Sequence, residues 1–128
     1  YDKKKKSLIN WILISNKKNK KINLFEDIYF SPLYIDTVIK FIIKLISSRK
    51  KGIYNIGSRN EISKSEFILL IAKKFKLKLN YNLIKYSEFK NYETKRPRNM
   101  GMNINKFEKE FKFKLPFIKN EINKLIIK

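Results

Sequence analysis

Hydrophobic and polar positions along the chain predict helices separated by short strands. Leu8–Ser15 is almost wholly apolar, which indicates a half-buried helix, and the charged turn Lys17–Lys21 follows it. Ile22–Phe25 is the length of a short strand and precedes a loop. A second helix is predicted over Thr37–Ser48, with Asp36 placed before it as an N-cap.

The predicted helix Thr37–Ser48 is apolar around most of its circumference. Lys40 and Lys44 occupy one side at i and i+4 spacing, and the other positions are mainly Ile, Val, Leu and Phe. We expect this wide face to be buried. Arg49–Lys51 complements the negative end of the helix dipole, and Gly52 suits a left-handed exit.

The next segment contains a strand, a helix and a second strand. Ile53–Ile56 reads as a short strand closed by Gly57. Ser63 and Glu66 form an S-x-x-E capping box before a helix predicted over Ser65–Lys76. Leu77–Tyr86 alternates partly between apolar and polar residues and is expected to be extended.

The C-terminal third begins with a polar loop and ends in two short helices. The loop covers Asn91–Gly101. Asn105 and Glu108 repeat the capping pattern before a helix carrying two Phe residues. Pro116 suits the first turn of a final helix with an apolar face.

The net charge of +20 raises the question of a polyanionic partner. Lys, Asn and Ile supply 62 of the 128 residues, whereas only four residues are Arg and one is Ala. This composition is typical of an A/T-rich genome, and the Lys residues are spread over the chain rather than gathered in a stripe. Nucleic-acid readers favour Arg for bidentate contacts. We therefore expect salt-sensitive, non-specific attraction to polyanions, and keep a basic nucleic-acid-binding domain as a less favoured alternative.

Cysteine and histidine are both absent from the chain. This excludes disulfides, zinc sites made from those residues, and catalysis by either side chain. No secretory signal or membrane-spanning helix is apparent, and a cytoplasmic location is predicted. Residue 1 is Tyr rather than Met, so we expect a processed product or a fragment.

Cofactor motifs are also missing. The three glycines, at 52, 57 and 101, form no G-x-G-x-x-G or P-loop sequence, so no dinucleotide loop is predicted. Tyr-x-x-x-Lys occurs three times, starting at Tyr1, Tyr81 and Tyr86, as chance allows in a Lys-rich chain. No catalytic residue and no metal ligand is therefore predicted.

Arg96-Pro97-Arg98-Asn99 is the most distinctive local cluster. Two forked guanidinium groups beside a rigid Pro suit a phosphate or diphosphate. A solvated basic loop is the alternative.

Several segments together resemble one family in order and spacing. They are Phe30–Asp36, Gly52–Ser58, Ile62–Phe67, Arg96–Lys106 and Leu115–Pro116. In this order they are similar to the C-terminal portion of an extended short-chain dehydrogenase/reductase, and most similar to the dTDP-4-dehydrorhamnose reductase group of sugar-nucleotide-binding proteins.

The resemblance implies a fold, a partner domain and a site. It implies an α/β substrate-binding lobe, a single partial domain over residues 1–128, with four or five helices and short, mostly parallel strands. The family's N-terminal Rossmann domain, which carries the NAD(P) loop and the catalytic Tyr and Lys, precedes the matched region. The chain alone is therefore expected to bind no cofactor and to be inactive.

The implied substrate is a nucleotide-sugar, with Arg96 and Asn99 as substrate-binding residues. The reductases typically read Arg-Pro-x-Asn-Ser-x-Leu-Asp, whereas this chain has Met100, Met102 and Asn103 at the last three specified positions. Two alternatives remain open: a non-catalytic nucleotide-sugar-binding or regulatory module, and an NAD-dependent sugar epimerase or dehydratase.

Overall fold

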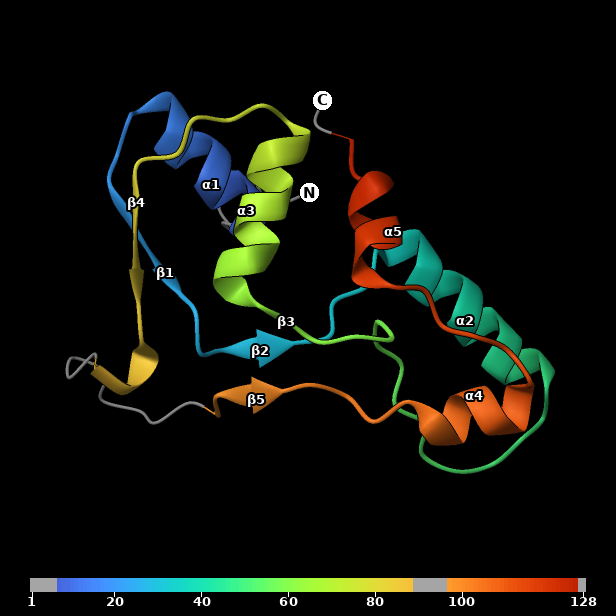
Figure 1. Cartoon of the computed structure of the whole chain (residues 1–128). Coiled ribbons are helices and arrows are strands. Elements are labelled where there is room, and N and C mark those ends of the chain that lie inside the picture. The colour runs from blue at the N-terminus through green and yellow to red at the C-terminus, as the bar shows by residue number, and fades with distance from the viewer. Residues whose placement is uncertain (1–6, 89–96, 127–128) are drawn as a thin grey trace. The chain divides into compact units, whose positions relative to one another are not determined.

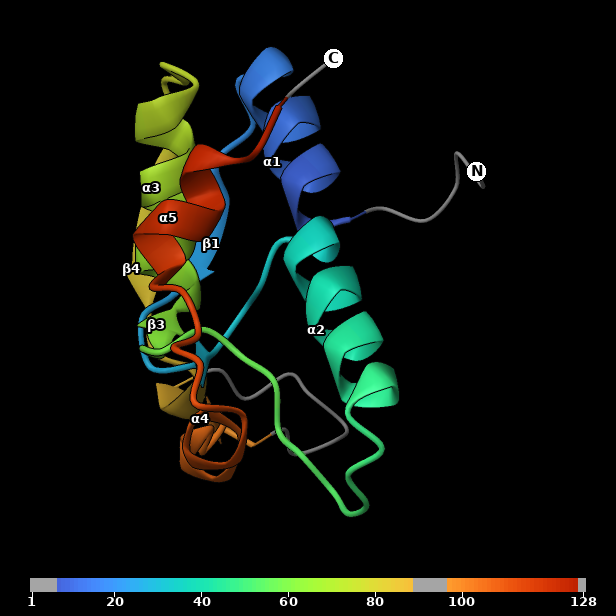
Figure 2. The same cartoon turned by 90° about the vertical axis from the view of Figure 1, so that its right-hand side faces the viewer.

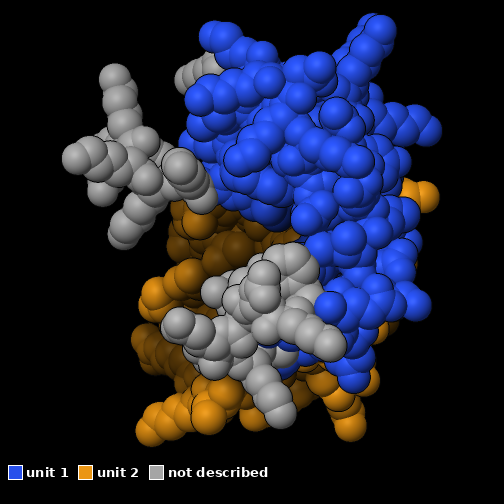
Figure 3. All heavy atoms as spheres, turned by 90° about the vertical axis from the view of Figure 1, so that its left-hand side faces the viewer, with its two compact units in different colours: residues 1–28, 63–98 blue, residues 29–62, 99–128 orange. Residues whose placement is uncertain are grey.

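The computed structural model describes residues 7–88 and 97–126, where helices and short strands alternate (Figures 1 and 2). The chain forms two compact units, each made of two segments that are distant in sequence (Figure 3). Unit 1 comprises Tyr1–Ile28 and Ser63–Arg98, and unit 2 comprises Tyr29–Ile62 and Asn99–Lys128. Within the described residues there are five α-helices and short strands that include two parallel pairs, which confirms the predicted α/β class.

Unit 1 is built on one pair of parallel strands. Its elements are α1 (Leu8–Lys17), β1 (Ile22–Phe25), α3 (Lys64–Lys74), β4 (Tyr81–Ile84) and the 3-10 helix η1 (Tyr86–Glu88). β1 and β4 align from Ile22 opposite Tyr81 to Phe25 opposite Ile84. Parallel neighbours require a long crossover, and α3 forms part of it while packing against β1.

The core of unit 1 joins both helices to β1. Ile12 of α1, Ile22 and Leu24 of β1, and Ile68 of α3 are buried together. The predicted capping box starts α3: Ser63 Oγ accepts from the Glu66 N–H at 3.1 Å, and Glu66 Oε2 accepts from the Ser63 N–H at 3.2 Å. The local sequence therefore sets where this helix begins.

Unit 2 contains three helices and two paired short strands. Its elements are β2 (Tyr29–Phe30), α2 (Ile35–Ser47), β5 (Asn99–Met100), α4 (Asn105–Phe111) and α5 (Ile118–Asn123). β2 and β5 are parallel, with Tyr29 opposite Asn99 and Phe30 opposite Met100. In the sheet order β2 is central, between β5 and β3 (Ile62–Ser63), which spans the boundary between the units.

Aromatic side chains dominate the core of unit 2. Phe41 of α2 and Phe107 of α4 meet edge to face with ring centroids 5.5 Å apart. Ile104 and Leu115 complete the buried cluster. Edge-to-face contact adds to the free energy gained from apolar burial, so these rings hold α2 against α4.

Two predicted N-caps are wrong. The N-cap of α2 is Tyr34, without a side-chain cap, and Asp36 lies in the first helical turn, where its charge still suits the helix dipole. The backbone N–H of Tyr34 instead donates to Glu121 Oε2 at 2.9 Å. Asn105 is likewise the first residue of α4 and not its cap. A long-range carboxylate therefore holds the N-cap residue of α2, and that residue makes no side-chain cap of its own.

The extended segments are shorter than predicted. Ile53–Ile56 is not a strand, because its backbone pairs with no neighbouring strand. Its Tyr54 and Ile56 side chains pack on the core of unit 2. Only Tyr81–Ile84 of the expected Leu77–Tyr86 strand is paired. After α2, Arg49 takes the left-handed conformation (φ 54°), and Gly52 has φ 128°.

The expected burial of the apolar face of α2 is also incomplete. Phe41 and Thr37 are buried. Five isoleucines on the helix are exposed, namely Ile35, Ile39, Ile42, Ile43 and Ile46, the last by 74%. Within residues 7–88 and 97–126, no helix combines the length and the hydropathy that crossing a bilayer requires.

Candidate functional site

The candidate site of unit 2 lies where two parallel strands end. β2 is followed directly by Ser31, and β5 by Gly101. Parallel strands place their carboxyl ends at the same edge of a sheet, which is where ligands commonly bind in α/β folds. A cavity of about 270 Å³ opens at this edge.

Polar side chains line this cavity, which we call the polar pocket. Its residues are Ser31, Ser58, Arg59, Glu61, Asn99, Gly101, Met102 and Asn103. They come from the ends of β2 and β5 and from the segment that precedes β3. Neighbouring strands thus bring together residues that are up to 72 positions apart in the sequence.

Ser31 joins the three segments around the polar pocket. Its carbonyl oxygen accepts from the Ser58 N–H at 3.3 Å, and its hydroxyl oxygen accepts from the Met102 N–H at 3.2 Å. Ser58 is fully buried, and its hydroxyl donates to the Asn60 carbonyl at 2.7 Å. These bonds hold the pocket wall in place.

Two glycines allow this close packing. A Cβ at Gly57 would lie 3.0 Å from Ser31 Cβ and 3.3 Å from Met102 Cβ. A Cβ at Gly101 would overlap Glu61 Oε2, so any side chain there would displace the carboxylate. Neither glycine belongs to a dinucleotide loop, and their role is to let polar segments approach each other.

The polar pocket has two charged lining residues, Arg59, which is already ion-paired, and Glu61. Arg59 Nε lies 3.2 Å from Glu108 Oε1, and its guanidinium stacks over the Phe117 ring with 5.2 Å to the centroid. Glu61 is exposed at the pocket and carries the opposite charge. Amide, hydroxyl and carboxylate groups of this kind suit a hydroxyl-rich ligand such as a sugar.

Asn99, one of the two predicted substrate-binding residues, lines the polar pocket. Its Oδ1 accepts from the Gly101 N–H at 2.7 Å, which leaves the amide nitrogen as a donor toward a ligand. Arg96, the other predicted residue, lies outside the described residues. The structure therefore places Asn99 beside a cavity and gives no position for Arg96.

Sequence reasoning did not nominate Ser31, Ser58, Glu61 or Asn103. Ser31 and Ser58 lie within the segments that carry the family resemblance, Ser31 directly after Tyr29 and Phe30, and Ser58 directly after Gly57. The available signal for these residues was that polar side chains follow short apolar segments, as they do where strands end at a ligand site. Their convergence depends on the pairing of two-residue strands, which leaves no periodic pattern in the sequence.

Arg98, a member of the Arg96-Pro97-Arg98-Asn99 cluster, belongs to unit 1 and influences Asp27. Burial alone would raise the pKa of the Asp27 carboxyl. Backbone N–H bonds from Tyr86 (2.7 Å) and Ser87 (3.3 Å), together with the charge of Arg98, outweigh it and lower the pKa. Asp27 thereby connects the end of β1 to η1. The positive charge of Arg98 helps to keep the Asp27 carboxyl ionised.

Comparisons with solved structures identify the same fold in a group of reductases. A dTDP-4-dehydrorhamnose reductase from Bacillus anthracis, solved with NADP, matches 96% of this chain with a TM-score of 0.83 and 21% identity. Reductases of the same name match with TM-scores of 0.79 (Clostridium acetobutylicum ortholog, 14% identity, 94% of this chain) and 0.78 (Yersinia enterocolitica, 20%, 94%). This chain covers 43%, 44% and 42% of those three proteins, respectively.

A search of curated proteins found no match to the sequence. The family model described as the RmlD substrate binding domain matches residues 1–128, the whole chain. The sequence match covers the polar pocket and both units, and the structural matches have the same α/β architecture. The chain therefore belongs to the RmlD substrate binding domain family.

Proposed function

We propose that this chain is the substrate-binding part of an NAD(P)-dependent nucleotide-sugar reductase, and that the polar pocket holds part of the nucleotide-sugar. Membership of the RmlD substrate binding domain family, with a polar pocket at the carboxyl ends of β2 and β5, is the observation that carries the proposal. The named relatives reduce a dTDP-linked sugar, so a nucleotide-sugar is the substrate class to test first.

The composition of the polar pocket favours the sugar rather than the phosphates. Its one cation, Arg59, is paired with Glu108, and Glu61 would repel a diphosphate at short range. Asn99 and Asn103 offer amide groups, and Glu61 offers acceptors for sugar hydroxyls. A diphosphate would need a cation from elsewhere, and the proposed one is Arg96, through paired N–H bonds to phosphoryl oxygens.

The cofactor belongs to another part of the proposed enzyme. The chain's three glycines offer no dinucleotide loop, and Gly57 and Gly101 pack closely against Ser31 and Glu61. The residues of this chain therefore do not fit NAD(P). We therefore assign only substrate binding and substrate orientation to this chain. A cytoplasmic location is part of the same proposal.

Ligand titration tests this proposal directly. Calorimetry with the 128-residue chain should show that dTDP-glucose binds more tightly than either dTDP or glucose, because the two halves of the ligand would meet different groups. An Asn99→Asp variant should weaken dTDP-glucose binding, whereas Asn120→Asp, on the exposed surface of α5, should not. Equal affinity for dTDP and dTDP-glucose, unaffected by Asn99→Asp, would contradict a sugar site in the polar pocket.

A non-catalytic nucleotide-sugar-binding module is the second candidate, because the three glycines of the chain form no dinucleotide-loop motif. Both candidates predict ligand binding, so titration does not separate them. The coding sequence upstream of Tyr1 does: a Gly-rich strand–turn–helix segment within about 150 residues favours the reductase, and its absence favours the module.

A further inference from the structure

Seven exposed lysines lie at one end of unit 1, although they come from two segments that are distant in sequence. They lie in the last turn of α1 or α3, or in the connection from that helix to β1 or β4. We call this surface the basic end of unit 1. It comprises Lys17, Lys18, Lys20, Lys21, Lys73, Lys76 and Lys78.

Strand pairing brings the two lysine segments to the same end. β1 begins at Ile22 and β4 at Tyr81, directly opposite each other, and the Ile22 N–H donates to the Asn80 carbonyl at 2.9 Å. Residues 17–21 and 76–80, which lead into these parallel strands, therefore lie at the amino ends of both. Figures 1 and 2 show that α1 and α3 also end there.

The lysine side chains of the basic end face solvent. In the connection to β4, Leu77 and Leu79 pack on the core of unit 1, whereas the alternate residues Lys76 and Lys78 are exposed. None of the seven lysines pairs with a carboxylate of the described residues, because the three ion pairs found there all lie in unit 2.

The described carboxylates of unit 1 lie away from the basic end. Glu26 and Asp27 follow β1, and Glu88 lies in η1 after β4, so these three are at the carboxyl ends of the strands. Glu66 lies in the first turn of α3, at the opposite end of that helix from Lys73. No described acidic side chain therefore offsets the charge of the basic end.

The helix dipoles offset only a small part of this charge. Lysines at helix C-termini are favourable because each terminus carries roughly half a negative charge. The C-termini of α1 and α3 thus account for about one of the seven positive charges. The remaining excess has no partner within unit 1 and complements an extended anionic surface.

The residue types of the basic end favour a lipid surface over a nucleic acid. All seven cations are Lys, whereas phosphate-backbone readers favour Arg. Ile14, which is 47% exposed, precedes Lys17 and Lys18 by about one helical turn, and Tyr81 is 40% exposed at the start of β4. Apolar and Tyr side chains beside lysines suit the interfacial region of a bilayer, whereas binders of single-stranded nucleic acid stack successive bases on several rings.

We propose that the basic end of unit 1 docks on an anionic lipid bilayer, with the lysines against the headgroups and Ile14 at the acyl boundary. Clusters of about four to eight lysines are sufficient for such contact, which needs no pocket and no fixed geometry. The chain lies on the bilayer in this arrangement and does not enter its hydrocarbon core. The inference depends on the charge distribution of unit 1 and is independent of the proposed nucleotide-sugar function.

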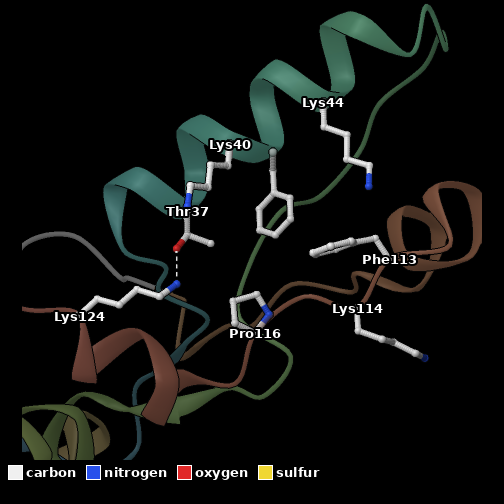
Figure 4. Close-up of a pocket in the computed structure, with 8 residues that line it drawn as sticks. Thr37, Lys40, Lys44, Phe113, Lys114, Pro116 and Lys124 are labelled. Carbon is white, nitrogen blue, oxygen red and sulfur yellow. Dashed lines mark hydrogen bonds between the residues drawn. The ribbon is translucent and has the colours of Figure 1, made fainter.

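The lysines of unit 2 are dispersed and provide a matched control. Around a cavity of about 360 Å³, Lys40 and Lys44 point in different directions, and Lys44 Nζ lies 4.4 Å from the Phe113 ring centroid (Figure 4). Lys124 is paired with a carboxylate and donates to Thr37 Oγ1 at 2.8 Å. These contacts engage single lysines with their own neighbours and form no common cationic surface.

Sedimentation with vesicles tests the docking. At about 0.15 M salt, the 128-residue chain should bind vesicles of phosphatidylcholine mixed with phosphatidylserine and should not bind phosphatidylcholine alone. Binding should weaken steeply as the salt concentration rises. Equal binding to both kinds of vesicle would overturn the proposal.

Charge-matched variants separate the basic end from the general charge of +20. The basic-end variant combines Lys17→Gln, Lys20→Gln, Lys21→Gln and Lys78→Gln. The control removes the same charge from exposed positions of unit 2 and combines Lys40→Gln, Lys51→Gln, Lys109→Gln and Lys119→Gln. Each lysine near an anionic leaflet raises affinity about fivefold, so the basic-end variant should lose at least about a hundredfold and the control no more than about fivefold. Equal losses would overturn the proposal.

A thymidine oligonucleotide distinguishes the lipid surface from nucleic acid. At the same salt concentration it should bind the chain more weakly than the mixed vesicles do. If the oligonucleotide bound more tightly, and the basic-end variant lost that binding, the surface would belong to a nucleic acid and the proposal would be wrong.

A direct readout guards against misfolded variants. In the unaltered chain, a spin-labelled lipid in the mixed vesicles should broaden the backbone amide resonances of residues 17–21 and 76–80. Ile14→Ser should weaken vesicle binding while the far-ultraviolet circular dichroism stays that of the parent chain. Broadening confined to residues of unit 2 would refute the basic end as the docking surface, even if a variant failed to fold.

Discussion

The side-chain oxygen of Asn99 accepts a 2.7 Å hydrogen bond from the backbone N–H of Gly101. Asn residues often stabilise turns through such a bond to the backbone two residues further on. The bond turns the chain at the end of β5 along the polar pocket and occupies the amide oxygen. It commits the oxygen of the Asn99 side chain to the turn, and under the proposed function the task of the nitrogen is to donate to the ligand.

Substitutions at Asn99 should separate these tasks. Asn99→Asp keeps an oxygen for the Gly101 N–H but removes the amide donor, so nucleotide-sugar affinity should fall by about 2- to 12-fold with little change in melting temperature. Asn99→Ala also removes the turn bond and should cost about 0.5–1.5 kcal/mol of unfolding free energy. Titration and thermal melting measure the two effects, and identical behaviour of both variants in both measurements would contradict the assignment.

Arg96 and Arg98 should differ in their effect on substrate. In the longer reductase that we propose, Arg96→Ala should raise the KM for the nucleotide-sugar about tenfold to a hundredfold, because a charge-assisted contact to the diphosphate is lost. Arg98→Ala should change KM little, since the Arg98 charge acts on Asp27. Small, equal effects from both would favour a solvated basic loop.

Acid should destabilise unit 2 through Glu121. Burial would raise the pKa of this carboxyl, but hydrogen bonds from Lys124, Thr37 and the Tyr34 N–H lower it below the ordinary value. Its contribution to stability is therefore present above the unfolded pKa of about 4.3 and is lost as the pH falls through the lower folded value.

Glu121→Gln should remove that contribution and lower the unfolding free energy by about 1–3 kcal/mol near pH 7. The stability of the variant should also depend less on pH below about pH 4.3. Glu88→Gln, an exposed carboxyl on η1, is the control and should leave both properties unchanged. Chemical denaturation between acid and neutral pH measures the difference, and parallel curves for Glu121→Gln and the parent chain would refute the role of Glu121.

NAD(P)H should not bind to the 128-residue chain. The chain contains no Gly-rich loop, and Gly57 and Gly101 are occupied in close packing within unit 2. Nicotinamide fluorescence titrated with the chain should stay flat into the millimolar range. Binding at micromolar concentration would show that these residues form a dinucleotide site after all.

The isolated chain should be poorly soluble because of α2. Its exposed isoleucines include Ile43 (58%) and Ile46 (74%) on one helix. Replacing both with Gln should reduce light scattering and keep the melting temperature, since neither belongs to the buried core. A parent chain that is a monodisperse monomer with a sharp melt above about 55 °C would contradict this prediction.

Local sequence patterns predicted the helices well and the sheet poorly. The start of α3, directly after its N-cap Ser63, was predictable because the capping box needs only residues three positions apart. β1 was predicted at its observed bounds because a short segment with three apolar residues, Ile22, Leu24 and Phe25, lies between the charged Lys21 and Glu26. β2 and β5 are two residues long and carry no periodicity, so only their pairing in the folded unit defines them.

Residue types and the order of short motifs along the chain were enough to predict the α/β class and the family, and the three glycines form no dinucleotide-loop motif. Asn99 was nominated from the family resemblance, and its role in binding stays a prediction. Only the tertiary structure decided that Ser31, Ser58 and Asn99 surround one cavity and that Tyr34 is held by Glu121. Those contacts join positions 27 to 87 residues apart, and the alignment of β2 with β5 and the packing of α5 on α2 determine them.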